Sequence, residues 1–90
     1  MSAARSRVVV HGRVQGVFFR DSVRRRAESR NVAGWVTNRP DGAVEAVFEG
    51  DPEAVASLVE YSRKGPSAAD VDEVEVFEEE PEGLSGFEIR

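Results

Sequence analysis

The stretch HGRVQGVFFR, residues 11–20, marks a change from strand to helix. A β-strand pattern from Arg7 to Val14 breaks at Gly16, and two aromatic residues and an arginine follow. Where a strand stops at a glycine and the chain restarts as a helix, several backbone N–H groups lack partners and lie at the positive end of the helix dipole. An arginine at that point adds a bidentate contact to an oxyanion. The sequence therefore predicts a small phosphate-binding loop.

This loop differs from the loops that bind nucleotides. It contains neither the G-x-x-x-x-G-K-[ST] pattern of a P-loop nor the G-x-G-x-x-G pattern of a dinucleotide site. One glycine at a strand-to-helix turn is also common for backbone reasons alone. Taken by itself, the loop leaves a structural and a phosphate-binding interpretation equally open.

A second stretch, GWVTNRPDG (residues 34–42), predicts a short strand that runs into a Pro-Asp-Gly turn. The two stretches resemble the signatures of the acylphosphatase family, G-R-V-Q-G-V-x-F-R and G-W-V-x-N-x-x-D-G. The resemblance extends through Glu49-Gly50, Gly65-Pro66 with Ala69 and Val71, and Phe87-Glu88-Ile89, so that it covers Arg7 to Arg90.

The resemblance implies an enzyme that hydrolyses acyl phosphates to a carboxylate and inorganic phosphate by attack of water, with neither metal nor cofactor. It also implies that Arg20 binds the phosphoryl group and that Asn38 orients the water. The cradle for the phosphoryl group would be the backbone N–H groups of Gln15, Gly16, Val17, Phe18, Phe19 and Arg20. Hydrogen bonds to charged groups are worth about 1.5–3 kcal/mol each, so several together can hold a phosphoryl group.

Each of these residues also has a plainer interpretation. Arg20 is one of five arginines on the same predicted helix, and the other four are expected to be solvated. Asn38 precedes a turn, which asparagine favours. His11, the single histidine, is expected to be structural. The aromatic residues Phe18, Phe19, Trp35, Phe48 and Phe87 are expected to belong to the core.

Hydrophobic periodicity predicts alternating strands and helices. Strands are expected at residues 7–14, on either side of Pro40-Asp41-Gly42, from Val71 to Phe77 and at residues 87–90. Helices are expected at residues 19–30, ending near Asn31, and after Asp51-Pro52 as far as Gly65-Pro66. The order β-α-β-β-α-β is typical of the α+β, ferredoxin-like split βαβ sandwich, with two helices on one face of an antiparallel sheet.

Length and composition agree with one domain over residues 1–90. The chain has no cysteine, so a disulfide framework and thiolate chemistry are excluded. No apolar run long enough for a membrane span and no signal-peptide pattern appears, so a cytoplasmic protein without a membrane partner is expected. We also expect a monomer.

The net charge of −5 is unevenly spread. Residues 1–40 have nine arginines against two acids, a balance of +7, and residues 41–90 have three basic residues against fifteen acids, a balance of −12. A solvated basic helix and an acidic sheet edge in one fold explain this asymmetry, and the overall acidity argues against nucleic acid as a partner.

Two other functions fit the same fold class. Acylphosphatase-like domains also occur inside larger proteins that handle carbamoyl phosphate, so a non-catalytic phosphate-binding module is one alternative. RNA-recognition domains share the split βαβ order, but they need stacking aromatic residues on their central strands. The strand beginning at Arg7 has no aromatic residue, and the strand containing Phe48 places it beside glutamates.

Overall fold

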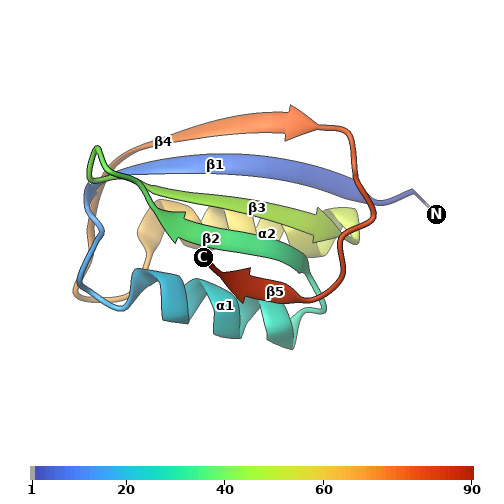
Figure 1. Ribbon diagram of the computed structural model, residues 1–90, viewed down its shortest axis with the longest axis horizontal. Helices are drawn as coiled ribbons and strands as arrows, with labels where there is room; N and C mark the ends of the chain where they lie inside the picture. Colours follow the sequence, from blue (N-terminus) through green and yellow to red (C-terminus); the bar gives the residue numbers. More distant parts are fainter. Residues whose placement is uncertain (1) are drawn as a thin grey trace.

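The structure, a computed structural model, describes residues 2–90 and contains two helices and five strands. In chain order the elements are β1 (Ala4–Arg13), α1 (Phe19–Ser29), β2 (Ala33–Asn38), β3 (Val44–Gly50), α2 (Pro52–Lys64), β4 (Asp70–Glu79) and β5 (Phe87–Ile89) (Figure 1). The predicted β-α-β-β-α-β order is confirmed. No helix in this part of the chain has the length and apolar character that crossing a membrane requires.

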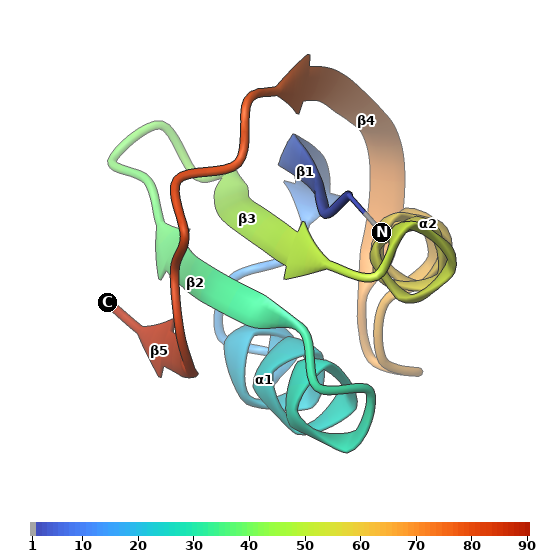
Figure 2. The ribbon, with the colours of Figure 1, turned by 90° about the vertical axis from the view of Figure 1, so that its right-hand side faces the viewer.

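The strands form one sheet in the order β4-β1-β3-β2-β5, and both helices pack on the same face of it (Figure 2). Four of the strands pair antiparallel, as predicted, but β5 pairs parallel to β2. The sheet is therefore mixed at this one edge, whereas the prediction described it as antiparallel. Residues 80–86 cross the end of the sheet at which β4 stops, so β5 begins at that end (Figure 1). From there β5 runs in the direction opposite to β4. β2 also runs opposite to β4, so β5 and β2 are parallel.

The core lies between the sheet and the helices. Each helix contributes a buried stripe at helical spacing, Phe19, Val23 and Ala27 from α1 and Ala54, Val55, Leu58, Val59 and Ser62 from α2. The helix-facing side of the sheet contributes alternate residues of each strand, among them Val8, Val10, Val36, Ala46 and Phe48. This packing fixes the start of α1 against the ends of β1 and β2.

The ends of the helices follow the predicted signals. Asp51 caps α2, because its side chain accepts a hydrogen bond from the backbone N–H of Ala54 at 3.2 Å, and Pro52 occupies the first helical position. Gly65 ends the helix. Asn31 follows α1 with a φ of 55°, the left-handed conformation that asparagine tolerates.

Two strands are longer than predicted. β1 begins at Ala4 instead of Arg7, and β4 runs from Asp70 to Glu79, beyond its predicted end at Phe77. A register shift between His11 and Gly12 adds one residue to β4 there, which explains why the half-buried Val71 and Val74, both packed against the core, are three positions apart.

The uneven charge is distributed over the fold as predicted. Arginines cover the exposed side of α1, and the acidic β4 forms one edge of the sheet. On the face without helices, arginines of β1 pair with glutamates of its neighbours: Arg5 contacts Glu49 and Glu79, and Arg7 contacts Glu79 and Glu45. The opposite charges of the two halves of the chain therefore meet on the open face of the sheet.

Candidate functional site

Residues 14–18 join β1 to α1 and contain the first part of the predicted phosphate-binding loop, Gln15–Arg20; the rest of that loop is the start of α1. Val14 and Val17 are almost completely buried, and their side chains anchor the loop from inside. Gly16 and Phe18 have φ values of 74° and 63°, in the left-handed region. The loop therefore turns sharply between two fixed points, and its backbone conformation is set by the core beneath it.

The start of α1 has no side-chain cap. Phe18 occupies the N-cap position without a side-chain hydrogen bond, and the first helical bond of this turn runs from the N–H of Ser22 to the carbonyl oxygen of Phe18 at 3.0 Å. Among residues 2–90 no hydrogen bond joins a backbone N–H of residues 15–21 to a protein acceptor. These donors remain available to an anion, at the end of the helix where the dipole favours one.

Arg20 differs from the other arginines of α1. Arg24 and Arg25 pair with Asp21, and the guanidinium of Arg26 lies 4.2 Å from the centre of the Tyr61 ring. Within the described residues no carboxylate lies within 4.0 Å of the half-buried Arg20. Arg20 therefore places an unneutralised charge beside the free N–H groups of the loop.

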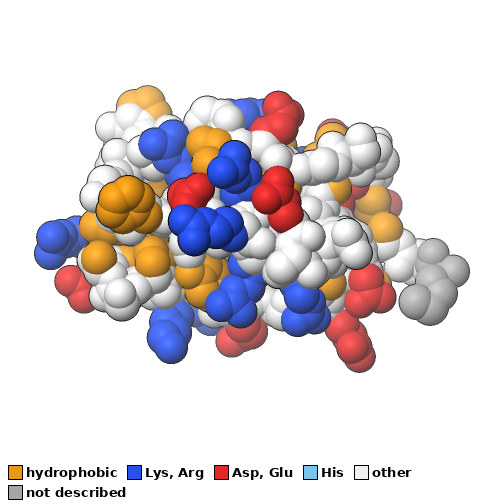
Figure 3. All heavy atoms as spheres, turned by 90° about the horizontal axis from the view of Figure 1, so that it is seen from below, with side chains coloured by type: hydrophobic (Ala, Val, Ile, Leu, Met, Phe, Trp, Pro, Cys, Tyr) orange, Lys and Arg blue, Asp and Glu red, His pale blue; other side chains and the backbone are white. Residues whose placement is uncertain are grey.

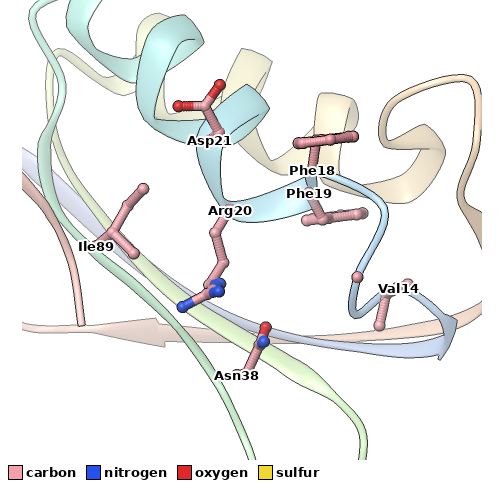
Figure 4. Close-up of a pocket in the computed structure, with 8 residues that line it drawn as sticks. Val14, Phe18, Phe19, Arg20, Asp21, Asn38 and Ile89 are labelled. Carbon is pink, nitrogen blue, oxygen red and sulfur yellow. The ribbon is translucent and has the colours of Figure 1, made fainter.

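Asn38 is the last residue of β2, where it pairs with Val44 of β3. Figure 4 shows its side-chain amide facing the guanidinium of Arg20 across the hollow. The structure thus brings Arg20 and Asn38 together from two elements that lie far apart in the sequence. Asn38 does stand at the start of a turn, but its amide faces the hollow as well.

The side chain of Gln15 also contributes to the site, in addition to the backbone N–H group that the sequence predicted as a donor. Its amide nitrogen Nε2 donates hydrogen bonds to the carbonyl oxygens of Arg39 and Ala43, at 2.8 and 2.9 Å. The turn is stabilised further by Asp41, whose carboxylate accepts from the N–H of Ala43 at 3.0 Å, and this bond helps to lower the pKa of Asp41. The loop and the turn after Asn38 are therefore held together.

A hollow of about 280 Å³ lies at this junction. Its lining residues come from three places in the chain and are Val14, Gly16, Phe18, Phe19, Arg20, Asp21, Asn38 and Ile89. The carboxylate of Asp21 points away from Arg20 and Asn38, and it is engaged by Arg24 and Arg25 (Figure 4). The part of the hollow between Arg20 and Asn38 is therefore positively charged and suited to an anion.

Two lining residues were not predicted correctly from the sequence. Phe18, expected in the core, is 82% exposed, because its left-handed backbone directs its side chain away from the interior. Ile89 was not considered, since its place in the hollow depends on the parallel pairing of β5 with β2. Of the other aromatic residues, Phe19, Phe48 and Phe87 are buried as expected, and Trp35 is half-buried beneath the guanidinium of Arg90.

The remaining candidates lie elsewhere. His11 contacts Glu75 at 2.7 Å and does not line the hollow, in agreement with a structural role. Phe48, the aromatic residue of the central strand β3, belongs to the helix-facing core. It is therefore not exposed on the open face of β3, where an RNA-recognition domain would need an aromatic residue that stacks on a base.

The fold and the hollow define a split βαβ protein with an anion site at the start of its first helix. The family model for acylphosphatase matches residues 6–89. An acylphosphatase from Rubrobacter xylanophilus is 61% identical over 96% of this chain and 79% of its own length. A solved acylphosphatase from Coxiella burnetii is 41% identical with a TM-score of 0.93, covering 98% of this chain and 93% of that one. HypF from T. kodakarensis is 37% identical with a TM-score of 0.79, over 96% of this chain and 11% of that one.

This chain belongs to the acylphosphatase family. The resemblance drawn from the two motifs is thereby confirmed, and with it the expected class of enzyme, a hydrolase of the acylphosphatase type.

Proposed function

We propose that the chain hydrolyses acyl phosphates in the hollow between the start of α1 and the end of β2. The observation that supports this most directly is the position of Arg20, a guanidinium without a carboxylate partner in the described residues, beside free backbone N–H groups and facing Asn38. Arg20 and the N–H groups of residues 15–20 bind the phosphoryl oxygens. Asn38 orients the attacking water.

The reaction depends on the positioning of substrate and water and on charge stabilisation more than on covalent catalysis. The water oxygen attacks phosphorus, and the bond between phosphorus and the acyl oxygen breaks, with its electron pair leaving on the carboxylate. The water's protons pass to phosphate oxygens or to solvent. Charge spreads over the phosphoryl oxygens in the transition state, where Arg20 and the N–H groups stabilise it.

Asn38 can orient the attacking water next to the phosphoryl group because its side chain is neutral. Its amide oxygen accepts one hydrogen bond from water. A carboxylate would be a stronger base, but its charge would repel the phosphoryl group. The departing carboxylate is a weak base, so the reaction does not require a general acid, and it proceeds without a metal.

Residues 1–90 work as one domain and as a monomer in the cytoplasm, with a small acyl phosphate as substrate and no nucleic-acid partner. The alternative to be separated from turnover is a phosphate-binding module without catalysis. The free charge of Arg20 fits both functions, whereas the orientation of Asn38 towards it favours turnover.

The test is hydrolysis of benzoyl phosphate in excess EDTA by the wild type, by Arg20→Ala and by Arg24→Ala. Arg24 lies one turn further along α1 and pairs with Asp21, so it controls for the loss of a helix arginine. The expected result is hydrolysis by the wild type and Arg24→Ala and a loss of about 1,000-fold in Arg20→Ala. p-Nitrophenyl phosphate, an ester, controls for general phosphatase activity. A folded wild type that binds inorganic phosphate without hydrolysing the anhydride would identify a binding module instead.

A further inference from the structure

We propose that the apolar side chains on either side of the phosphoryl position in this hollow, Ile89 and Phe18, bind the acyl group and select the substrate. The proposal rests on the proposed function, because it assumes that the phosphoryl group lies between Arg20 and Asn38. The substrate class that follows is acyl phosphates with an apolar acyl group, aromatic or branched, rather than a short or charged one.

The two residues lie on different sides of the phosphoryl position. Figure 4 shows Ile89 on one side of Arg20 and Phe18 on the other, and both line the same hollow. An acyl group that extends from a phosphoryl group held at Arg20 therefore meets an apolar side chain in either direction. The volume of about 280 Å³ lies just below the range of about 300–1,000 Å³ for small-molecule sites, so the hollow suits a small substrate.

The exposure of Ile89 follows from the geometry of β5. Alternate residues of a strand share a face, so Ile89 lies on the helix-facing side together with Phe87. Phe87 is buried against Phe48, but Ile89 remains 37% exposed over the hollow. The strand is pinned there, since the N–H of Arg90 donates to the carbonyl oxygen of Val36 at 2.8 Å.

Phe18 has an unfavourable backbone conformation, with a φ of 63°. A left-handed backbone is rare for a bulky side chain and costs about 1–3 kcal/mol. The ring does not recover this cost by burial, since it is 82% exposed, the largest exposure among the large hydrophobic residues of the range 2–90. Strain of this kind is found at binding sites. In the view from the α1 side, hydrophobic side chains gather at the end of the molecule that contains the loop, beyond the mixed charges over the helix (Figure 3).

The first experiment compares kcat/KM for benzoyl phosphate and acetyl phosphate in the wild type, Ile89→Ala and Phe18→Asn. Asparagine tolerates the left-handed backbone, so Phe18→Asn removes the ring without adding strain. Phe77→Ala is the matched control, because Phe77 is 38% exposed on β4 and lies outside the hollow. Because the acyl group extends to one side of the phosphoryl position, at least one of the two site variants is expected to lower the benzoyl-to-acetyl ratio of kcat/KM about 10-fold, and Phe77→Ala is expected to leave the ratio unchanged.

The second experiment measures binding without turnover. Calorimetric titration with benzylphosphonate and methylphosphonate compares ligands with the same anionic group and different apolar groups. The wild type is expected to bind benzylphosphonate about 10-fold more tightly, and the site variant that lowers the kcat/KM ratio is expected to lose that difference. Equal affinities in the wild type, or an unchanged benzoyl-to-acetyl ratio in both site variants, would overturn the acyl site. A wild type that hydrolyses neither substrate but prefers benzylphosphonate would refute the enzyme proposal and support the apolar site.

Discussion

Gln15 Nε2 lies 2.8 Å from the carbonyl oxygen of Arg39, and this hydrogen bond joins the loop before α1 to the turn after β2. Gly16 follows Gln15 in the loop, and Asn38 precedes Arg39 in the turn. One side chain therefore sets the distance between the backbone donors and the residue proposed to orient water. Errors of about 1 Å in such a distance can reduce a rate about 100-fold.

We predict that Gln15→Glu lowers kcat/KM for benzoyl phosphate about 100-fold. A carboxylate at this position cannot donate, and it would face the carbonyl oxygens of Arg39 and Ala43. Steady-state kinetics at pH 7 measure the effect. Ser57→Ala is the control, since it also removes a side-chain hydrogen bond to a backbone carbonyl but lies on α2. Equal activity in Gln15→Glu and Ser57→Ala would mean that the contact does not position the site.

Asn38 allows catalysis and phosphate binding to be separated. We predict that Asn38→Ala reduces kcat at least 100-fold and changes the inhibition constant for inorganic phosphate less than threefold, because the phosphoryl oxygens are bound by Arg20 and the loop. Asn38→Asp should weaken phosphate binding as well, since its charge repels the anion. Product-inhibition kinetics give both constants. If Asn38→Ala lost phosphate affinity and kcat together, Asn38 would be a ligand of the phosphoryl group.

The approach of β5 to the hollow depends on a buried carboxylate. Glu49 is 4% exposed and accepts hydrogen bonds from the N–H groups of Glu82, Gly83 and Leu84, at 2.9, 3.2 and 3.1 Å. Arg5 Nη1 contacts the same carboxylate at 2.7 Å. These bonds fix the segment that crosses the end of the sheet. Since this segment leads into β5, Glu49 positions Ile89 from the far side of the fold.

We predict that Glu49→Gln lowers the free energy of unfolding by about 2 kcal/mol at pH 7, because the buried Arg5 then loses its ion pair with Glu49 and keeps the contact with Glu79. Burial opposes ionisation of Glu49, but the hydrogen bonds from Glu82, Arg5 and Leu84 lower its pKa below the ordinary value of about 4.5. A lowered carboxylate pKa stabilises the folded state above the unfolded pKa, and this stability is lost as the pH falls through the folded pKa.

Urea unfolding of the wild type and Glu49→Gln from pH 7 to pH 2.5 measures this dependence. The difference between the two proteins should stay constant down to about pH 4.5 and shrink below it. Glu88→Gln, an exposed glutamate on β5, is the control and should differ little from the wild type. A difference that grows as the pH falls would contradict the assigned direction of the pKa shift.

The local patterns of the chain predicted most of the fold. Asp51-Pro52 and Gly65 gave the bounds of α2, and the two motifs placed Arg20 and Asn38 in one site, where the structure brings them together. The direction of β5 could not be predicted in this way. It depends on the contact of Glu49 with residues 82–84, which are more than 30 positions away, and a glutamate in an alternating strand gives no signal of burial.

The exposure of Phe18 could not be predicted from the sequence for a related reason. Adjacent phenylalanines in a mostly apolar stretch indicate core positions, and Phe19 is indeed 2% exposed. The left-handed turn that separates the two side chains depends on Val14 and Val17 being anchored in the core, which no short pattern shows. For the same reason, the residues that contact the phosphoryl group were easier to predict than those proposed to contact the acyl group.

Gly34 makes the close approach of β2 to β3 possible. Its φ is 142°, and a Cβ at this position would lie 1.8 Å from the carbonyl oxygen of Val47. We predict that Gly34→Ala lowers the free energy of unfolding by more than about 3 kcal/mol, because the backbone of the two central strands must separate. Thermal and urea unfolding measure the loss. Gly83→Ala is the matched control: its φ is also positive, at 79°, but a Cβ there meets no atom within 4 Å, so only the backbone cost of about 1 kcal/mol remains. Similar losses in the two variants would show that backbone conformation alone, and not the contact with β3, requires glycine at position 34.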